Sequence, residues 1–336
     1  PLLIMSLIAA APGTPGGSGG PYMVKDIDPG RLGSAPRYGA AMDGELFFSA
    51  DDGTYGRELW KSNGTETGTV RIEDIYAKGG DSNPIPGTDT GGWLFFGADD
   101  GIRGTELWKT DGSTPGTGPV KDIRPGSEGS VPLPQAAIGD TLFMAADDGT
   151  HGRELWKSDG SATGTVLVKD IVPGSDKSDP KWLAKFGGML YFAAIHEDEV
   201  SDGFHSLWKS DGTGPGTELV KRSEIDDVSW LLEVSGELFF LSDDRATSGQ
   251  RCPELWKSDG TGGGTIQIVL DPSDAPCAYS PIDVGGTLFF RTSEWYDGCE
   301  DPRLWKSDGT PAGTVPVKEF SCGPSYDPES GEPRIA

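Results

Sequence analysis

The sequence predicts an all-β fold, a β-propeller of four-stranded blades, and three observations lead to this prediction. The tripeptide Leu-Trp-Lys occurs six times at intervals of 48 to 52 residues, a period in the range of propeller blades. Turn motifs rich in Gly, Asp and Pro stand on both sides of each copy. No stretch shows sustained helical spacing of apolar residues. The six motif tryptophans are Trp60, Trp108, Trp156, Trp208, Trp256 and Trp305.

The third copy of the repeat illustrates the four strands that we expect in each blade. A short first strand lies within 131–139, an apolar second strand opens 139–150, and the tryptophan strand fills 152–160. The fourth strand lies within 164–174 and ends at Pro-Gly, a turn signal. Second strands such as 46–48 (LFF) are apolar on both faces, which is typical of strands packed between two neighbouring layers.

The repeat as a whole follows the pattern LFF-x-ADDG-x-x-G-x-ELWKSDGT-x-x-GT-x-x-VKDI-x-PG. This pattern resembles the ELWxxDGT repeat family of bacterial exported and surface proteins, and the similarity covers roughly residues 22–320. The resemblance implies a propeller in an extracellular or cell-surface setting, and it carries no established chemistry. Copies one to three match best, whereas FHSLWKS (204–210) and DPRLWKS (301–307) lack the Glu.

The number of blades is open between two interpretations. Second and third strands occur six times, but fourth strands occur seven times, the extra copy being Tyr22–Gly30. Residues 323–336 resemble the start of a first strand, as in 31–44. We favour a seven-bladed ring of which this chain, truncated at the C-terminus, contains six complete blades. Such a ring would close by pairing the extra N-terminal strand with the first three strands of a C-terminal blade, which removes exposed sheet edges. The alternative is six complete blades with one spare strand.

The N-terminus and the charge indicate an exported protein. Residues 1–11 hold an apolar run followed by three Ala, which resembles the end of a signal peptide, and 12–21 reads as a Gly/Pro linker before the propeller domain of 22–336. The net charge of −25 argues against binding to nucleic acid or to an anionic membrane. We therefore expect a secreted or surface-displayed, monomeric protein whose partner is an extracellular glycan or a surface protein.

The ADDG loops are candidate Ca²⁺ sites, because paired Asp residues followed by a Glu offer hard oxygen ligands at a tight turn. Their spacing is not that of an EF-hand, and the alternative is a solvated turn with an Arg–Glu or Lys pair nearby. The candidate ligands are Asp51, Asp52, Glu58, Asp99, Asp100, Glu106, Asp147, Asp148 and Glu154.

The tryptophans of the best-matching copies are candidate platforms for sugar rings, namely Trp60, Trp108 and Trp156. The simpler interpretation is packing between blades, since one Trp recurs on the same strand of every repeat. The loop of copy four departs from the repeat and contains His196 and His205 among carboxylates. Those residue types can bind a transition metal, but their spacing matches no familiar motif, and a solvated long loop is the favoured interpretation.

The four cysteines are expected to form disulfides, because their number is even, no CxxC pair occurs and the protein is expected outside the cell. Equivalent positions in the repeat favour Cys252–Cys277 and Cys299–Cys322, and a Cys277–Cys299 bridge stays open.

Catalysis is not expected. The sequence contains no GxSxG, HExxH or phosphate-binding glycine loop, and a catalytic pair should be unique rather than copied in every blade. The favoured function is a binding or adhesion module with calcium-ordered loops that recognises carbohydrate. A structural scaffold is the first alternative. A polysaccharide hydrolase or lyase is the second, and it would use unique residues such as Glu197 or His205.

Overall fold

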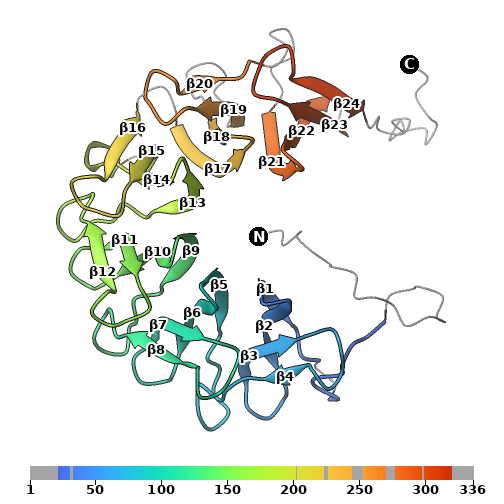
Figure 1. Cartoon of the computed structure of the whole chain (residues 1–336), viewed down its shortest axis with the longest axis vertical. Helices are drawn as coiled ribbons and strands as arrows, with labels where there is room; N and C mark the ends of the chain where they lie inside the picture. Colours follow the sequence, from blue (N-terminus) through green and yellow to red (C-terminus); the bar gives the residue numbers. More distant parts are fainter. Residues whose placement is uncertain are drawn as a thin grey trace, which may run out of the picture. The chain divides into compact units, whose positions relative to one another are not determined.

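The computed structural model describes residues 22–30, 33–201, 203–222, 226–243, 253–269, 277–296 and 299–319. These residues form six four-stranded antiparallel sheets and one short 3₁₀ helix, and the chain divides into two compact units, Pro1–Asp179 and Pro180–Ala336 (Figure 1). The predicted all-β propeller fold with six complete blades is confirmed. Residues 1–21 and 323–336 lie outside the described residues, so the signal peptide, the linker and the closure of a seventh blade stay predictions.

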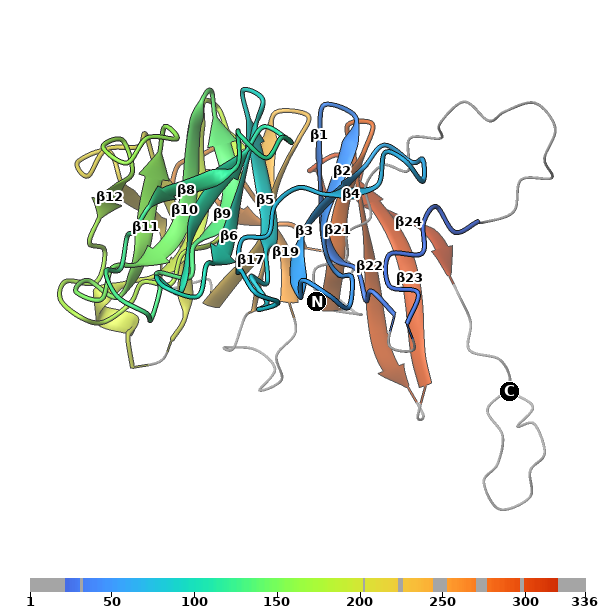
Figure 2. The ribbon, with the colours of Figure 1, turned by 90° about the horizontal axis from the view of Figure 1, so that it is seen from below.

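The first unit contains three sheets in which each strand pairs with the next one along the chain (Figure 2). Its strands are β1 (Arg37–Met42), β2 (Glu45–Asp51), β3 (Arg57–Ser62), β4 (Val70–Arg71), β5 (Ile85–Thr90), β6 (Trp93–Asp99), β7 (Thr105–Thr110), β8 (Gly118–Lys121), β9 (Leu133–Ile138), β10 (Thr141–Asp147), β11 (Arg153–Ser158) and β12 (Val166–Lys169). The first strands of neighbouring sheets contact one another, β1 with β5 and β5 with β9.

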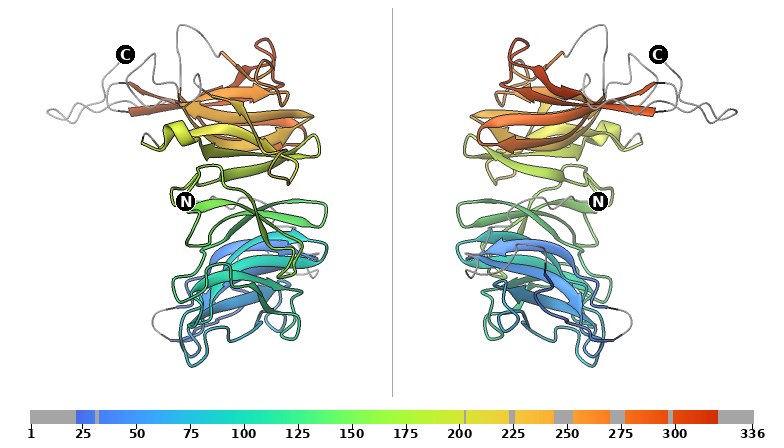
Figure 3. Two further views of the ribbon diagram at one scale, coloured as in Figure 1. Left: turned by 90° about the vertical axis from the view of Figure 1, so that its left-hand side faces the viewer. Right: turned by 90° about the vertical axis from the view of Figure 1, so that its right-hand side faces the viewer.

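The second unit repeats this arrangement with three further sheets. Its elements are β13 (Lys181–Phe186), β14 (Met189–Ile195), η1 (Glu197–Glu199), β15 (His205–Ser210), β16 (Glu218–Lys221), β17 (Asp226–Val234), β18 (Glu237–Asp243), β19 (Pro253–Ser258), β20 (Ile266–Gln267), β21 (Cys277–Val284), β22 (Thr287–Tyr296), β23 (Cys299–Ser307) and β24 (Val315–Glu319). Figure 3 shows η1 as a short coil beside these strands. No helix among the described residues is long and apolar enough to cross a membrane.

The core lies between neighbouring sheets rather than inside any one of them. Phe47 and Leu59 of the first sheet form one buried cluster with Phe96 and Trp108 of the second. The second unit does the same, since Phe240 and Trp256 join the cluster of the preceding sheet. A middle strand that lies between two sheets is covered on both faces, so its sequence is a run of apolar residues instead of an alternating pattern.

Candidate functional site

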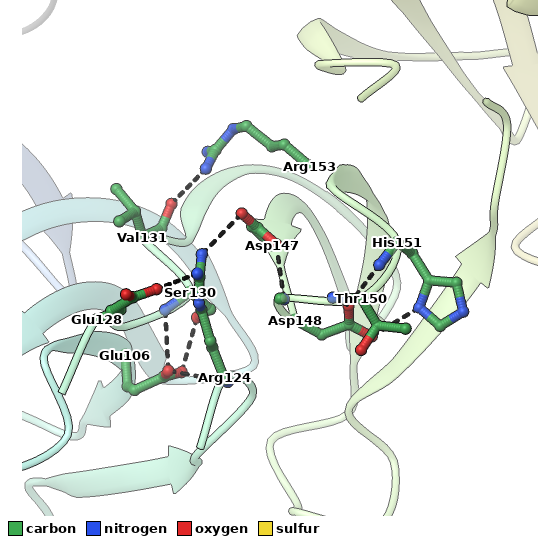
Figure 4. Close-up of polar contacts among 11 residues, drawn as sticks. Glu106, Arg124, Glu128, Ser130, Val131, Asp147, Asp148, Thr150, His151 and Arg153 are labelled. Atoms are coloured by element: carbon green, nitrogen blue, oxygen red, sulfur yellow. Dashed lines mark hydrogen bonds and ion pairs between the residues drawn. The ribbon is translucent and has the colours of Figure 1, made fainter. Parts of the chain in front are cut away.

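The glutamate of the ELW motif is a buried link inside the first unit. Glu106 on β7 is 1% exposed, and its carboxylate accepts hydrogen bonds from the backbone N–H groups of Ile123, Arg124 and Ser130 and from the Ser130 hydroxyl, at 2.7–3.0 Å. Figure 4 shows the bonds from Arg124 and Ser130. Those donors lie on the segment that leaves the fourth strand and leads into the next sheet. Glu106 therefore ties its own sheet to the start of the following one.

Glu58 and Glu154 make the equivalent link in the first and third sheets. Both are fully buried, and each accepts a hydrogen bond from a serine hydroxyl, Ser82 at 2.7 Å and Ser178 at 2.6 Å. Burial raises the pKa of Glu58 and of Glu154 to about 7, although the hydrogen bonds that they accept act in the opposite direction. Burial raises the pKa of Glu106 as well.

The paired aspartates of the ADDG loops hold their own turns. Asp51 Oδ1 accepts from the backbone N–H of Gly53 at 2.8 Å, and Asp52 Oδ1 accepts from Thr54 and Tyr55 at 2.8–2.9 Å. The loops of the second and third sheets repeat these bonds. Such side-chain bonds to nearby N–H groups stabilise the turn without any ligand.

The predicted Ca²⁺ ligands are not brought together as one set. Glu58 faces Ser82 and the N–H groups after the fourth strand, whereas Asp51 and Asp52 are engaged within their loop. Among the described residues, no group of three or more His, Cys, Asp or Glu side chains is placed to hold a metal ion. The same separation of the loop aspartates from the buried glutamate occurs in the second and third sheets, that is, for Asp99, Asp100 and Glu106 and for Asp147, Asp148 and Glu154.

Trp108 and Trp156 pack between neighbouring sheets, whereas Trp60 packs with Phe48 and Ala50 of its own sheet against Ile27. Trp60, Trp108 and Trp156 are only 6–8% exposed, so they do not offer a ring face to a sugar in this structure. Trp108 lies 6.3 Å from Phe96, measured between ring centroids, and Trp156 belongs to a buried cluster that includes residues of the preceding sheet. The simpler of the two sequence interpretations accounts for these three residues.

The loop of the fourth sheet rebuilds the glutamate link from different residues. Ser206 stands where the other copies have Glu, and its hydroxyl donates to Glu199 of η1 at 2.9 Å. Arg222, at the end of β16, pairs with Asp198 and Glu199 at 2.8 and 3.3 Å. The inserted Glu199 thus supplies a carboxylate where the other copies have the motif Glu. The sequence analysis did not predict the contact between Glu199 and Ser206, because Glu199 lies outside the repeat.

The two histidines of this loop are held apart from one another by separate partners. His196 stacks on Trp208 with ring centroids 5.8 Å apart, and its Nδ1 accepts from the N–H of Asp198. His205 is 5% exposed, and its Nδ1 lies 3.2 Å from Asp227 Oδ1. The described residues show no metal-ligand group here.

His151 is the third histidine, and it lies in the ADDG loop of the third sheet. Its Nδ1 is 2.8 Å from Asp148 Oδ2 (Figure 4), and this hydrogen bond raises the pKa of His151. The equivalent residue of the second sheet is Arg103, which pairs with Asp100. Because the repeat places an Asp partner at this position, the His–Asp pair is a loop contact equivalent to that of Arg103 and Asp100.

Of the four cysteines, Cys277 at the start of β21 is disulfide-bonded. Cys252 and Cys322 lie outside the described residues, and nothing is described for the side chain of Cys299. The predicted pairing therefore stays a prediction.

Two tryptophans outside the repeat motif form a feature that the sequence analysis did not single out. Trp182 on β13 and Trp230 on β17 stack with ring centroids 5.0 Å apart and planes inclined by 23°, and both are only partly buried. They lie on the first strands of neighbouring sheets, which contact one another. The available signal was their position, since six of the ten Trp residues stand in LWK and these two do not.

The backbone at both tryptophans is unusual. Each stands at a bulge of its strand, where the pairing register shifts, and their φ angles are +54° and +55°. Bulky side chains rarely adopt this left-handed region, and such residues cluster at binding and active sites. Tyr38, at the bulge of β1, has φ +50° and is 49% exposed. Asp227 and Ser280 adopt the same left-handed conformation at first-strand bulges, so these strained positions hold both aromatic and polar residues.

Comparison with solved structures identifies the fold only. A puromycin hydrolase matches with a TM-score of 0.52 and 14% identity, over 84% of this chain and 44% of that one. Prolyl oligopeptidase B from Galerina marginata matches at 0.55 and 10%, over 85% and 42%. The β-propeller domain of the Trilobed protease from Pyrococcus furiosus matches at 0.50 and 13%, over 84% of both chains. The chain spans less than half of the first two proteins. No family model and no curated protein matches it.

Proposed function

We propose that this chain is a non-catalytic binding module that recognises carbohydrate through Trp182 and Trp230. The observation that carries the proposal is their stacked, partly exposed pair on first strands, held in a strained backbone conformation. Strain of this kind costs about 1–3 kcal/mol per residue, so a purely structural role would be better met by Gly at these positions. Aromatic rings supply flat apolar contact area for the C–H face of a sugar ring.

The proposal moves the ligand contacts away from the LWK motif. The motif residues are engaged in packing and in links between sheets, and the ADDG aspartates are engaged in their own turns. The six motif copies support membership of the ELWxxDGT repeat family and, with it, a secreted or surface-displayed setting. The peptidases with similar propellers share only 10–14% identity with this chain, so we take no substrate from them.

The test is a glycan array probed with the purified chain and with three single variants. Trp182→Ala and Trp230→Ala should each lower binding to the recognised sugars at least tenfold. The matched control is Trp93→Ala, which removes another partly buried Trp, one that packs under Lys109 in the first unit. Thermal melts confirm that each variant is folded.

Parallel arrays with Ca²⁺ and with a chelator test whether the ADDG loops contribute. Sugar binding that persists in the chelator excludes a calcium requirement. Glycan binding that is unchanged in both tryptophan variants contradicts the proposed site. Absence of any glycan binding contradicts carbohydrate recognition and favours a protein partner.

A further inference from the structure

The N-terminal segment 22–30 lies against the first sheet as fourth strands lie against the sheets that follow them. Lys25 Nζ donates to the backbone oxygen of Thr69 at 2.8 Å, just as Lys121 Nζ donates to Thr165 at 2.7 Å. Ile27 packs on the buried cluster of Phe48, Ala50 and Trp60. Segment 22–30 therefore occupies the fourth-strand position of a blade that precedes β1.

In complete blades of this unit, the fourth strand and the residues after it form a carboxylate cradle. We define the cradle as the N–H groups of two successive residues after the fourth strand together with the serine that leads into the next sheet. For Glu106 these residues are Ile123, Arg124 and Ser130, of which Figure 4 shows Arg124 and Ser130. The cradle of Glu58 consists of Ile75, Tyr76 and Ser82, and that of Glu154 includes Ile171 and Ser178.

The repeat supplies a fourth copy of the cradle at the N-terminus, formed by Ile27, Asp28 and Ser34. Ser34 is placed as its counterparts are, because its backbone oxygen accepts from the N–H of Asp51 at 3.0 Å. The same bond joins Ser82 to Asp99 at 3.0 Å and Ser130 to Asp147 at 3.1 Å. Within the described residues, no carboxylate is hydrogen-bonded to these three donors.

Segment 22–30 also resembles a fourth strand whose third-strand neighbour is not among the described strands. In the second blade, β7 pairs with β8 through Leu107 and Lys121, and Val120 is buried. The equivalent Val24 is only partly buried, and the neighbouring Tyr22 and Met23 are 76% and 75% exposed. A strand added along this edge would bury Val24 as Val120 is buried in the second blade.

We propose that this edge binds an extended strand with the repeat's own Arg-Glu-Leu-Trp-Lys pattern, supplied by a separate copy of the repeat. The Glu carboxylate of that strand would enter the cradle of Ile27, Asp28 and Ser34, and its backbone would pair with segment 22–30. Addition of a strand to an open sheet edge is a known mode of peptide recognition, in which main-chain bonds give affinity and side-chain pockets give specificity. The site is independent of the tryptophan pair.

The experiment measures fluorescence anisotropy of a labelled peptide with the sequence of residues 152–160, GRELWKSDG, titrated with the full chain. We expect saturable binding. A peptide with Glu154→Gln should bind about tenfold more weakly, because hydrogen bonds to a charged acceptor are worth roughly twice those to a neutral one. Ser34→Ala in the chain should weaken binding by a similar factor.

The matched control is Ser130→Ala, which makes the same change in a cradle that already holds Glu106. This variant should melt at a lower temperature and bind the peptide as the unmodified chain does. Equal binding of the Glu and Gln peptides, or no binding, overturns the proposal. So does a Ser34→Ala variant whose melting temperature falls as far as that of Ser130→Ala, since a carboxylate of the chain would then already occupy the cradle.

Discussion

The two units of the chain have the same sheets and the same core but different links between neighbouring sheets. In the first unit, a buried Glu on the third strand of every sheet accepts hydrogen bonds from the segment that leads to the next one. In the second unit, the equivalent positions hold Ser206, Glu254 and Arg303. Ser206 meets Glu199 of the insertion, the fifth sheet keeps the motif glutamate as Glu254, and Arg303 pairs at 3.7 Å with Glu319 on β24 of its own sheet.

This comparison shows which part of the repeat the fold requires. The apolar LFF and LW positions recur in both units because they fill the space between sheets, whereas the polar link tolerates exchange of its residues when a partner changes with it. Two departures from the repeat, η1 and the stacked pair of Trp182 and Trp230, lie in the second unit. We expect binding residues in segments whose sequence departs from the repeat.

The largest expected effect concerns the core that both units share. Phe96→Ala in the first unit and Phe240→Ala in the second should each lower the free energy of unfolding by about 3–5 kcal/mol. Both side chains are fully buried and lie 6.2–6.3 Å from a motif Trp, measured between ring centroids. Chemical denaturation of the two variants checks this prediction. Losses that differ by more than about 2 kcal/mol would show that the cores are not equivalent.

The second prediction concerns the links, where the units should differ. Glu106→Ala leaves a cradle of buried donors without an acceptor and should cost about 3 kcal/mol, given about 1–3 kcal/mol for each buried polar group left unpaired. Ser206→Ala removes one hydrogen bond to Glu199, which also pairs with Arg222, and should cost about 1 kcal/mol. Urea titrations measure both losses, and a Ser206→Ala loss as large as that of Glu106→Ala would contradict the comparison.

The third prediction is a pH dependence specific to the first unit. The pKa of Glu58 and of Glu154 is raised from 4.5 to about 7, so the folded chain binds more protons than the unfolded chain between these values. Their contribution to stability is therefore fully present below pH 4.5 and is lost as the pH rises to about 7. We expect the melting temperature to fall by about 5 °C between pH 5 and 7.

The control for this pH dependence is the double variant Glu58→Gln/Glu154→Gln, which keeps an acceptor oxygen at both positions but does not titrate. Its melting temperature should depend less on pH over the same range. If the slope is unchanged in the double variant, the dependence comes from the overall acidic charge rather than from these two groups.

The sequence contained enough information to predict the sheets, and less to predict the site. The LWK period and the turn motifs determine four strands per blade because apolar runs and Gly-rich turns are local signals. The contact of Glu199 with Ser206 depends on how an insertion folds back, which no period encodes. The left-handed backbone at Trp182 and Trp230 could not be predicted either, since sequence preferences argue against bulky residues there.

The smallest expected effect is at the ADDG loops, where the first unit itself varies. Position 151 is His, whereas the second sheet has Arg103, and both side chains pair with the second Asp of their loop. His151→Arg should therefore change the free energy of unfolding by no more than about 0.5 kcal/mol at pH 7, as is usual for exposed ion pairs. The pKa of His151 is raised by Asp148, so its contribution is present at low pH and is lost as the pH rises through that pKa.

Because Arg stays charged at every accessible pH, His151→Arg should stabilise the chain slightly at pH 8 and leave it unchanged at pH 5. Thermal melts of the variant and the unmodified chain at the two pH values measure this difference. The control is Asp148→Asn, which removes the charge of the shared partner and should abolish any advantage of Arg over His. A loss of several kcal/mol on His151→Arg would instead mean that the imidazole has a role that Arg103 lacks, and the loop of the third sheet would then join the tryptophan pair as a functional departure from the repeat.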